Sequence, residues 1–332
     1  MASNPQSISV TPPRLINSII AGFNIVANNI WMVALPVALD LFLWFGPQFR
    51  LQKLMTPIIQ EATRYLAEFN SSDMAARMNA IGEIWTASLE HFNLANILRT
   101  IPIGVPSLIA SSEAYETPLG NPLIIEIDST VLALGLWVLF LVLGFLLGCA
   151  YFNQLARVTA ENHPPFKIYD YLSQALQSLL LTIGLLVFLM IISLPAMLFV
   201  SIFALINPAL ANIGMLFIIF VILWMLIPLI FTPHGIFSGQ RNLLVSLMTS
   251  FRLVRSFLPG TGLFLLVSLL LAQGLDILWR VPPANSWLTL VGILGHAFIY
   301  TGLFAASFVY FRGGLRWMLE MIQQREARSV QV

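Results

Sequence analysis

The most informative feature of this 332-residue chain is its shortage of charge. Only 9% of its residues are charged, whereas 58% are hydrophobic and the mean hydropathy is +0.86. A soluble globular domain is about one quarter charged, so this chain has too few charges to cover a surface exposed to water. We therefore expect lipid to be the solvent for most of its surface, as in an integral membrane protein.

Reactive groups are scarce as well. The single cysteine, Cys149, excludes a disulfide within the chain and any metal site that needs two thiolates. The sequence has no GxSxG, HExxH, Walker loop or dinucleotide fingerprint. We therefore expect no enzyme activity and assign no catalytic residue, metal ligand or cofactor. A net charge of +1 gives no reason to expect nucleic acid as a partner.

Long stretches without Asp, Glu, Lys or Arg indicate the membrane spans, because about 20 apolar residues cross the hydrocarbon. Stretches of 28, 70, 20 and 31 residues follow Asp128, Asp170, Arg255 and Arg280. The 70-residue stretch must form a hairpin, whose turn is expected at Asn207-Pro208 because Asn and Pro favour turns. The sequence thus predicts an all-α, polytopic transmembrane helix bundle of about six spans. We place them at 28–47, 129–156, 174–206, 210–231, 260–280 and 288–311.

Basic residues set the orientation, because cytoplasmic loops are enriched in Lys and Arg. With the N-terminus inside, ten basic residues fall in inside segments, whereas only Arg280 falls in a short outside loop. Fourteen of the sixteen basic residues are arginine, which favours a GC-rich bacterial genome. We expect a bacterial inner-membrane protein with both termini in the cytoplasm, together with loops 157–173 and 232–258. His163 and His234 would then lie in cytoplasmic loops.

The spans divide the chain into regions. A cytoplasmic N-terminus with an interfacial leader helix (1–27) precedes span one, and spans two to six occupy 129–311. A cytoplasmic tail (312–332) follows them. The intervening segment 48–128 lies outside in this scheme.

Two amphipathic helices are predicted in the outside segment, over 51–69 and 74–92. Their apolar residues recur at spacings of three and four, which places them on one helix face. A hinge is expected at Asn70-Ser71-Ser72. Beyond these helices, the apolar stretches IPIGVPSLIASS (101–112) and TPLGNPL (117–123) are expected to be proline-broken connections. The helices would form a packed lid on the transmembrane bundle, or bind lipid or a partner protein.

One segment occurs twice without gaps. Residues 18–26 (SIIAGFNIV) match residues 246–254 (SLMTSFRLV), and both run into a predicted span. A weaker third copy begins at Ser173. The unit would be an amphipathic helix at the cytoplasmic surface, followed by an outward and a return span. Such repeats occur in transporters, and they are equally compatible with a protein that only organises membrane.

The stretch SLMTSFRLVRSFLPGTGLFLLVSLLL (246–271) resembles the membrane region of the glycerophosphoryl diester phosphodiesterase membrane-domain family and related uncharacterised bacterial multi-span proteins. Residues 18–45 resemble it loosely. In that family a serine-bearing leader helix with a Phe-or-Trp, Leu-Val pattern enters an apolar span. The resemblance implies a multi-span membrane protein. The family's chemistry belongs to a separate soluble domain, which is expected to be absent here, so no catalytic residue carries over.

The second leader helix carries the predicted lipid contacts. Phe251, Leu253 and Val254 are expected to insert along the inner leaflet, while Arg252 and Arg255 reach anionic headgroups, each contributing about 1 kcal/mol. A GxxxG pattern in span two, Gly144 and Gly148, predicts close approach of another helix.

Ionisable residues inside a span cost about 2.5–3.5 kcal/mol each on insertion scales, so they are functional candidates. Asp40 lies in the outer half of span one, where a donor on another span or outer water should reach its carboxyl group. It would make a structural hydrogen bond or take part in proton or ion transport. His296 and Tyr300 share a face of span six. The intramembrane polar candidates are Asp40, His296, Tyr300, Gln273, Asp276 and Arg280.

The outer end of span five carries Gln273 and a local ion pair between Asp276 and Arg280, predicted from their spacing of four. The repeat would bring Gln273 and Arg280 into the same outer layer as Asp40. For His296, a buried group with its hydrogen bonds satisfied is the simplest interpretation.

These observations favour a non-enzymatic membrane protein, either a permease-like bundle or a subunit that organises lipid or partners. A transporter should have a water-accessible cavity near mid-membrane, lined by Asp40, His296 or Tyr300. An organising subunit should be tightly packed with its polar groups paired. The alternative, a lipid-modifying membrane enzyme, would need a cluster of acids and histidines at one interface. The expected partners are membrane lipids, other membrane proteins or further copies of the chain.

Overall fold

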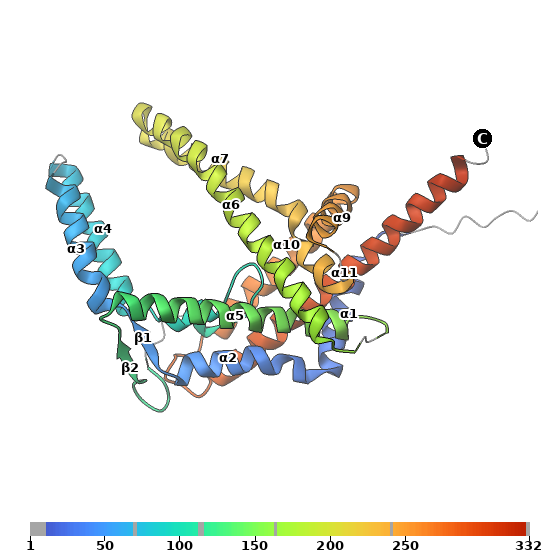
Figure 1. The fold of residues 1–332 in the computed structure, drawn as a ribbon, viewed down its shortest axis with the longest axis horizontal. Helices are drawn as coiled ribbons and strands as arrows, with labels where there is room; N and C mark the ends of the chain where they lie inside the picture. The colour runs from blue at the N-terminus through green and yellow to red at the C-terminus, as the bar shows by residue number, and fades with distance from the viewer. Residues whose placement is uncertain (1–10, 69–71, 112–115, 163–164, 240–241, 330–332) are drawn as a thin grey trace, which may run out of the picture. The chain divides into compact units, whose positions relative to one another are not determined.

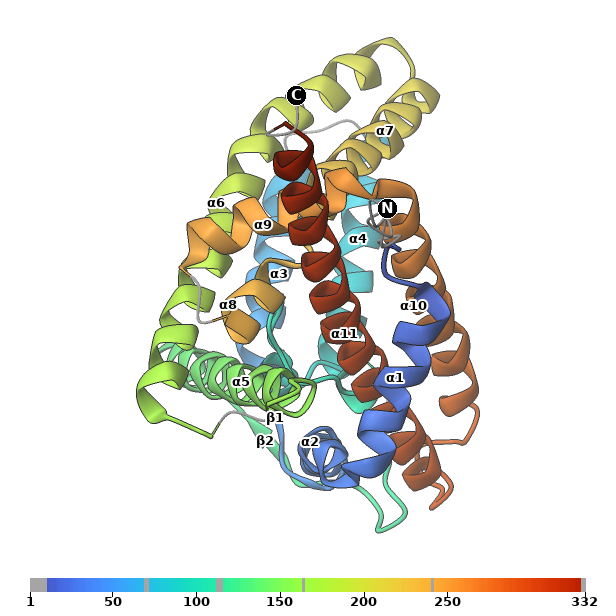
Figure 2. The same cartoon turned by 90° about the vertical axis from the view of Figure 1, so that its right-hand side faces the viewer.

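In the computed structural model the chain is almost entirely helical. The structure describes residues 11–68, 72–111, 116–162, 165–239 and 242–329. Figures 1 and 2 trace the chain by colour from its N-terminus to its C-terminus. It forms two compact units that alternate along the sequence. Unit one contains Met1–Asn29, Phe152–Leu270 and Gly302–Val332, whereas unit two contains Ile30–Tyr151 and Leu271–Thr301.

Five helical stretches are long and apolar enough to cross a membrane, and a bent pair at the N-terminus makes up to six. The predicted helical bundle with about six candidate spans is therefore confirmed. The helix bounds are α5 (Thr130–Val158), α6 (Ile168–Ile206), α7 (Pro208–Leu226), α10 (Leu258–Trp279) and α11 (Thr289–Ser329). A 3-10 helix η4 (Ile227–Leu229) and α8 (Thr232–Gly239) continue the α7 stretch.

The last span differs from its predicted form. Helix α11 runs as one element of 41 residues from Thr289 to Ser329. It passes through the boundary expected between span six and the tail at 311 and 312. The reason is that the charged residues after this point, such as Arg312 and Arg316, are good helix formers and continue the helix without a break.

The turn of the long hairpin lies where it was predicted. Helix α6 ends at Ile206 and α7 begins at Pro208, and the two lie side by side (Figure 1). The Asn207 side chain accepts a hydrogen bond of 2.8 Å from the backbone N–H of Ala209 and so caps α7. A proline is well tolerated in the first turn of a helix, where its missing N–H needs no partner. Asn207 and Pro208 together therefore end one helix and start the next.

Span one is not the straight helix predicted over 28–47. Helix α1 (Leu15–Asn28) ends where the predicted span begins. A 3-10 helix η1 (Ile30–Val33) then leads into α2 (Ala34–Phe45). The chain is bent by 93° at this break. Asn29 causes the break, since its backbone is not helical and its side chain bonds a carbonyl of α1. At 1.5 Å per residue, α2 alone is roughly 18 Å long, which is shorter than the hydrocarbon.

The repeated sequence segment has a matching local structure. Helices α1 and α9 (Leu243–Ser256) each contain 14 residues, and each is followed after one residue by another helix. The linking residues are equivalent in the sequence match and have similar backbone angles, φ −133° and ψ 56° at Asn29 and φ −142° and ψ 53° at Phe257. Equivalent positions are buried in both copies: Ser18, Gly22 and Val26, and Ser246, Ser250 and Val254. The weaker copy at Ser173 lies inside α6, which continues through the equivalent position.

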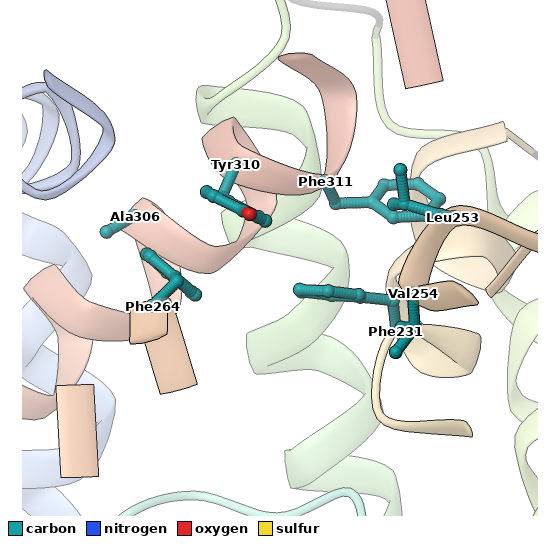
Figure 3. Close-up of a cluster of buried hydrophobic side chains, with 7 residues drawn as sticks. All are labelled: Phe231, Leu253, Val254, Phe264, Ala306, Tyr310 and Phe311. Carbon is teal, nitrogen blue, oxygen red and sulfur yellow. The ribbon is translucent and has the colours of Figure 1, made fainter. Parts of the chain in front are cut away.

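Figure 3 shows a hydrophobic cluster of unit one to which α9, α10 and α11 contribute. Leu253 and Val254 are 1% and 0% exposed, and they pack inside the protein. The prediction that they insert into the inner leaflet is therefore wrong, because α9 turns this face towards aromatic side chains of the same unit. Only Phe251, at 45% exposure, remains on the outer face. The cluster consists of Phe231, Leu253, Val254, Phe264, Ala306, Tyr310 and Phe311.

The segment 232–258 contains the predicted leader helix, which is α9, and also the short helix α8, which the sequence did not predict. His234 in α8 is buried, and its Nε2 atom lies 2.7 Å from the Ser307 hydroxyl oxygen. Its ring centroid is 4.4 Å from that of Phe308. His234 is thus a core residue of unit one, since the imidazole has both an aromatic neighbour and a polar partner there. The other loop histidine, His163, lies outside the described residues.

In unit two, the ends of the outside segment are joined by a short sheet that the sequence did not predict. Strand β1 (Gln48–Arg50) pairs in parallel with β2 (Ile124–Glu126). The Asn93 side chain accepts hydrogen bonds from the backbone N–H groups of Phe49 and Ala95, at 3.1 and 3.0 Å. These bonds connect β1 to the start of the 3-10 helix η2 (Leu94–Leu98). The two ends of the segment 48–128 therefore lie next to each other, where β1 pairs with β2.

The two helices predicted in the outside segment are present as α3 (Gln52–Glu68) and α4 (Ser72–Glu90). They pack on each other, with Gly82 next to Thr63. Asn70 and Ser71 of the expected hinge lie outside the described residues. Over its described length α3 contains no buried residue. A packed lid is therefore the wrong description of α3, whose apolar face meets only α4 in part and otherwise remains exposed.

Candidate functional site

The centre of unit two contains a largely non-helical stretch, which we call the buried segment (98–109). Ile103, Val105 and Leu108 in this stretch are each at most 2% exposed. Helix α5 makes room for it with two glycines. A Cβ atom at Gly144 would overlap the carbonyl oxygen at the start of the buried segment, and one at Gly148 would lie 2.7 Å from the Cα of Gly104. Of the glycine pair predicted to contact another helix, Gly144 therefore contacts the last residue of the 3-10 helix η2, and Gly148 contacts non-helical backbone.

Asp40 binds the far end of the buried segment. It lies in the middle of α2 and is 0% exposed. Its Oδ1 atom accepts hydrogen bonds from the Ser107 hydroxyl at 2.5 Å and from the backbone N–H of Ile109 at 3.1 Å. Its Oδ2 atom accepts one from the backbone N–H of Leu108 at 3.1 Å. Three donors thus surround one buried carboxylate, an arrangement that we call the Asp40 site.

The donors of the Asp40 site differ from those predicted. The sequence suggested a partner on another span or outer water, but the donors belong to the buried segment. The reason is that backbone N–H groups outside a helix or sheet need a partner when they are buried, and an ionised carboxylate is the strongest acceptor available. The Ser107 hydroxyl also accepts a 3.0 Å hydrogen bond from the Ala110 N–H. Asp40 and Ser107 together therefore satisfy the start of the 3-10 helix η3 (Ile109–Ser111).

The C-terminal end of α10 and the N-terminal part of α11 hold a second polar cluster. Arg280 Nε donates to Asp276 Oδ2 at 2.7 Å, which is the ion pair predicted from sequence. The other oxygen, Asp276 Oδ1, lies 3.5 Å from His296 Nε2. The His296 ring centroid is 4.3 Å from that of Tyr300 and the ring planes are tilted by 34°, so the two predicted neighbours on α11 are in contact. Asp276, Arg280, His296 and Tyr300 are thus brought together by two helices.

Three buried polar atoms in or beside this second cluster make no hydrogen bond with the described residues. They are the Trp279 indole N–H, His296 Nδ1 and Asp276 Oδ1. Trp279 packs on α11, where glycine positions leave space for it. A Cβ atom at Gly295 would lie 2.7 Å from its ring. The cluster is therefore a packing site with spare polar atoms, and sequence reasoning missed Trp279 because an apolar helix gives no sign of which tryptophan faces inward.

The two clusters meet at one backbone group. Arg280 Nη2 lies 3.5 Å from the Leu108 carbonyl oxygen, while Asp40 binds the N–H of the same residue. Arg280 is therefore in the same layer as Asp40, as the repeat suggested. Gln273 lies seven residues earlier on α10, where its side chain is exposed. Ser107 was missed in the sequence, where its stretch was taken for a proline-broken connection.

The predicted lipid contacts on α9 remain on the surface. Arg252 and Arg255 are exposed, and Arg255 lies in the last turn of the helix. A cation at this end interacts favourably with the helix dipole.

Comparisons with known proteins give no further assignment. No protein-family model, curated protein or solved structure matches this chain.

Proposed function

We propose that this chain is a multi-span membrane protein that organises lipid or partner proteins, and that it neither transports a solute nor catalyses a reaction. The observation that carries the proposal is the Asp40 site. Its carboxylate is buried and bound by three donors of the same unit. A residue that exchanges protons or binds a transported cation needs a path to water. Asp40 instead satisfies non-helical backbone within an apolar region, which membrane proteins tolerate where that backbone is buried in protein.

The cavities of the described residues also favour an organising role. Those that stand out lie between α3 and α4, beside α3, and where the ends of α5 and α8 and the start of α6 meet the middle of α11. Their walls are formed by residues other than Asp40, His296 and Tyr300. A permease of the kind considered above would place at least one of these three residues on a water-accessible cavity.

The accessibility of Tyr300 tests the absence of a transport path. In a Cys149→Ser background, Tyr300→Cys in membrane vesicles should react with a water-soluble maleimide no faster than Leu186→Cys, an exposed apolar position of α6. Asn79→Cys on the exposed surface of α4 provides the fast reference. Mass shifts report the rates. Reaction at Tyr300→Cys at a rate close to that of Asn79→Cys would indicate a water-filled path and contradict the proposal.

We further propose that both termini and α9 face the cytoplasm, because the basic residues divide ten to one in favour of the inside segments. In the same Cys149→Ser background, Asn79→Cys should react with an impermeant maleimide on intact cells. Ser256→Cys, which is exposed at the end of α9, should react only after permeabilisation. The opposite pattern would reverse the topology.

The α1 and α9 segments are proposed to be an internal duplication. The support is their equal length, their equivalent breaks at Asn29 and Phe257, and the same buried face. The resemblance of 246–271 to the glycerophosphoryl diester phosphodiesterase membrane-domain family is proposed on the leader sequence alone. It is compatible with an organising role, since it concerns the membrane part of that family.

A further inference from the structure

Unit one contains a cavity of about 250 Å³ where α5 ends and α6 begins. We call it the basic cavity. Its wall includes three basic side chains, Arg157, Lys167 and Arg312, and one acidic side chain, Asp170. The formal charge of these four groups is therefore three minus one, or +2. Two buried polar residues, Asn153 and Gln174, also line the cavity, and each is 5% exposed. Asn153 Nδ2 donates a hydrogen bond of 2.6 Å to Gln174 Oε1.

Two of the basic side chains, Arg312 and Arg157, contact neighbouring groups of the same unit. Arg312 donates to the Thr159 hydroxyl at 3.0 Å and to the carbonyl oxygen of Ala156, in the last turn of α5. Its third acceptor is the Ser238 hydroxyl, at 3.4 Å. All these acceptors are neutral, and Arg312 makes no salt bridge with a carboxylate among the described residues, although Glu161 interacts with it electrostatically. The Arg157 guanidinium lies 5.6 Å from the centroid of the Phe166 ring, a cation–π distance.

The start of α6 adds to the positive potential. Lys167 is its N-cap residue, and its side chain does not cap the helix. The first N–H groups of a helix carry a partial positive charge and readily bind anions. The Lys167 side chain itself is exposed at the mouth of the cavity. The wall thus combines three cations, polar side chains and a helix start within one unit.

We infer that the basic cavity binds an anionic phosphate group. Arginine and lysine are the side chains that most often bind phosphate, arginine through paired N–H donors and lysine as a point charge. The volume is below the roughly 300–1,000 Å³ of pockets for drug-sized ligands, so it suits a headgroup or a small phosphate ester. The cavity also lies at the end of an apolar helix, where lipid headgroups are expected if the chain spans a membrane. In this respect the inference rests on the proposed function.

The shared chemistry is a phosphate group, which either a phospholipid or a soluble phosphate can supply. The full chain, purified in a neutral detergent, should bind a fluorescent phosphatidylglycerol more tightly than a fluorescent phosphatidylcholine. The double variant Arg157→Gln with Lys167→Gln should lose this binding by about tenfold or more, because two of the wall's cations are removed. Arg312 is left unchanged in this test, since its hydrogen bonds to α5 are needed for folding.

A matched control removes the same charge elsewhere. The double variant Arg252→Gln with Arg255→Gln also loses two cations, but from the exposed surface of α9. It should weaken binding by less than about threefold. Equal losses in the two double variants would overturn the inference, because they would reflect only the overall charge. Unchanged binding in the Arg157 and Lys167 variant would overturn it as well. If that variant does not fold, Lys167→Glu alone, at an exposed position, must weaken binding.

Two further measurements separate the outcomes. Inorganic phosphate at millimolar concentration, added to the wild type, shows whether a soluble anion displaces the lipid. Displacement that depends on Arg157 and Lys167 assigns the cavity to a soluble phosphate, whereas its absence assigns the cavity to the lipid headgroup. Alkaline carbonate extraction of cell membranes tests the proposed function independently. A protein that stays in the membrane but binds both lipids equally contradicts only the cavity assignment.

Discussion

Asp40→Ala should lower the free energy of unfolding by about 3 kcal/mol or more. The substitution leaves the Ser107 hydroxyl and the N–H groups of Leu108 and Ile109 without their acceptor. Each buried donor that loses its partner costs about 1–3 kcal/mol. Denaturation with sodium dodecyl sulfate in mixed micelles, followed by circular dichroism, measures the change. Ser107→Ala should lower the free energy of unfolding by less, about 1–2 kcal/mol, because the carboxylate keeps its two backbone donors.

Asp40→Asn tests whether both oxygens of the Asp40 carboxylate accept hydrogen bonds. An asparagine would be tolerated if the carboxyl group met one donor, because the amide retains an acceptor oxygen. In the Asp40 site, however, Oδ1 and Oδ2 both accept. The amide nitrogen must therefore face a donor, at a cost of about 1–3 kcal/mol. The control is Glu61→Gln, which removes an exposed pair with Arg64 and should cost less than about 0.5 kcal/mol. An Asp40→Asn protein as stable as the wild type would contradict the assignment.

Gly144→Ala and Gly148→Ala should each destabilise unit two by about 1–3 kcal/mol, the usual cost of overpacking. At both positions the added methyl group would overlap backbone atoms of the buried segment, which cannot rotate away as a flexible side chain can. Part of this cost is offset by the better helix propensity of alanine, about 1 kcal/mol. The same denaturation experiment measures the change.

Gly135→Ala is the matched control, because it lies in the same helix and has no atom within 4 Å of an added Cβ among the described residues. It should be neutral or slightly stabilising. If all three alanine variants behave alike, the glycine face of α5 does not hold the buried segment. If Gly144→Ala and Gly148→Ala instead change only the oligomeric state, the pair acts between chains, as GxxxG patterns do in other membrane helices.

Local signals in the sequence identified the elements that depend on chain composition. Asn207 and Pro208 end a helix wherever they occur together, so the hairpin turn could be placed to the residue. The amphipathic spacing of the outside segment likewise predicted α3 and α4. The match between 18–26 and 246–254 extended to structure, since the two leader helices have the same length and break. None of these features requires a distant contact.

The sequence could not reveal what the helix faces meet. Leu253 and Val254 fit an interfacial helix as well as a protein core, because both environments are apolar and composition does not distinguish them. The same ambiguity affects the glycines of α5, which allow close approach by any backbone. The stretch 98–109 looked like a connection because it contains prolines and lacks periodicity. Its burial follows only from the glycines and from Asp40, which are distant in sequence.

The number of candidate spans was thus predictable from the sequence alone, because the length of an apolar stretch and its lack of charge depend on composition. The tertiary structure decided the role of the polar groups. Asp40 is 67 residues from Ser107, and Arg157 is 155 residues from Arg312. Whether such groups meet depends on how the helices pack, and helix packing in an apolar solvent is governed by the shapes of small residues and by a few hydrogen bonds. Neither can be read from hydropathy.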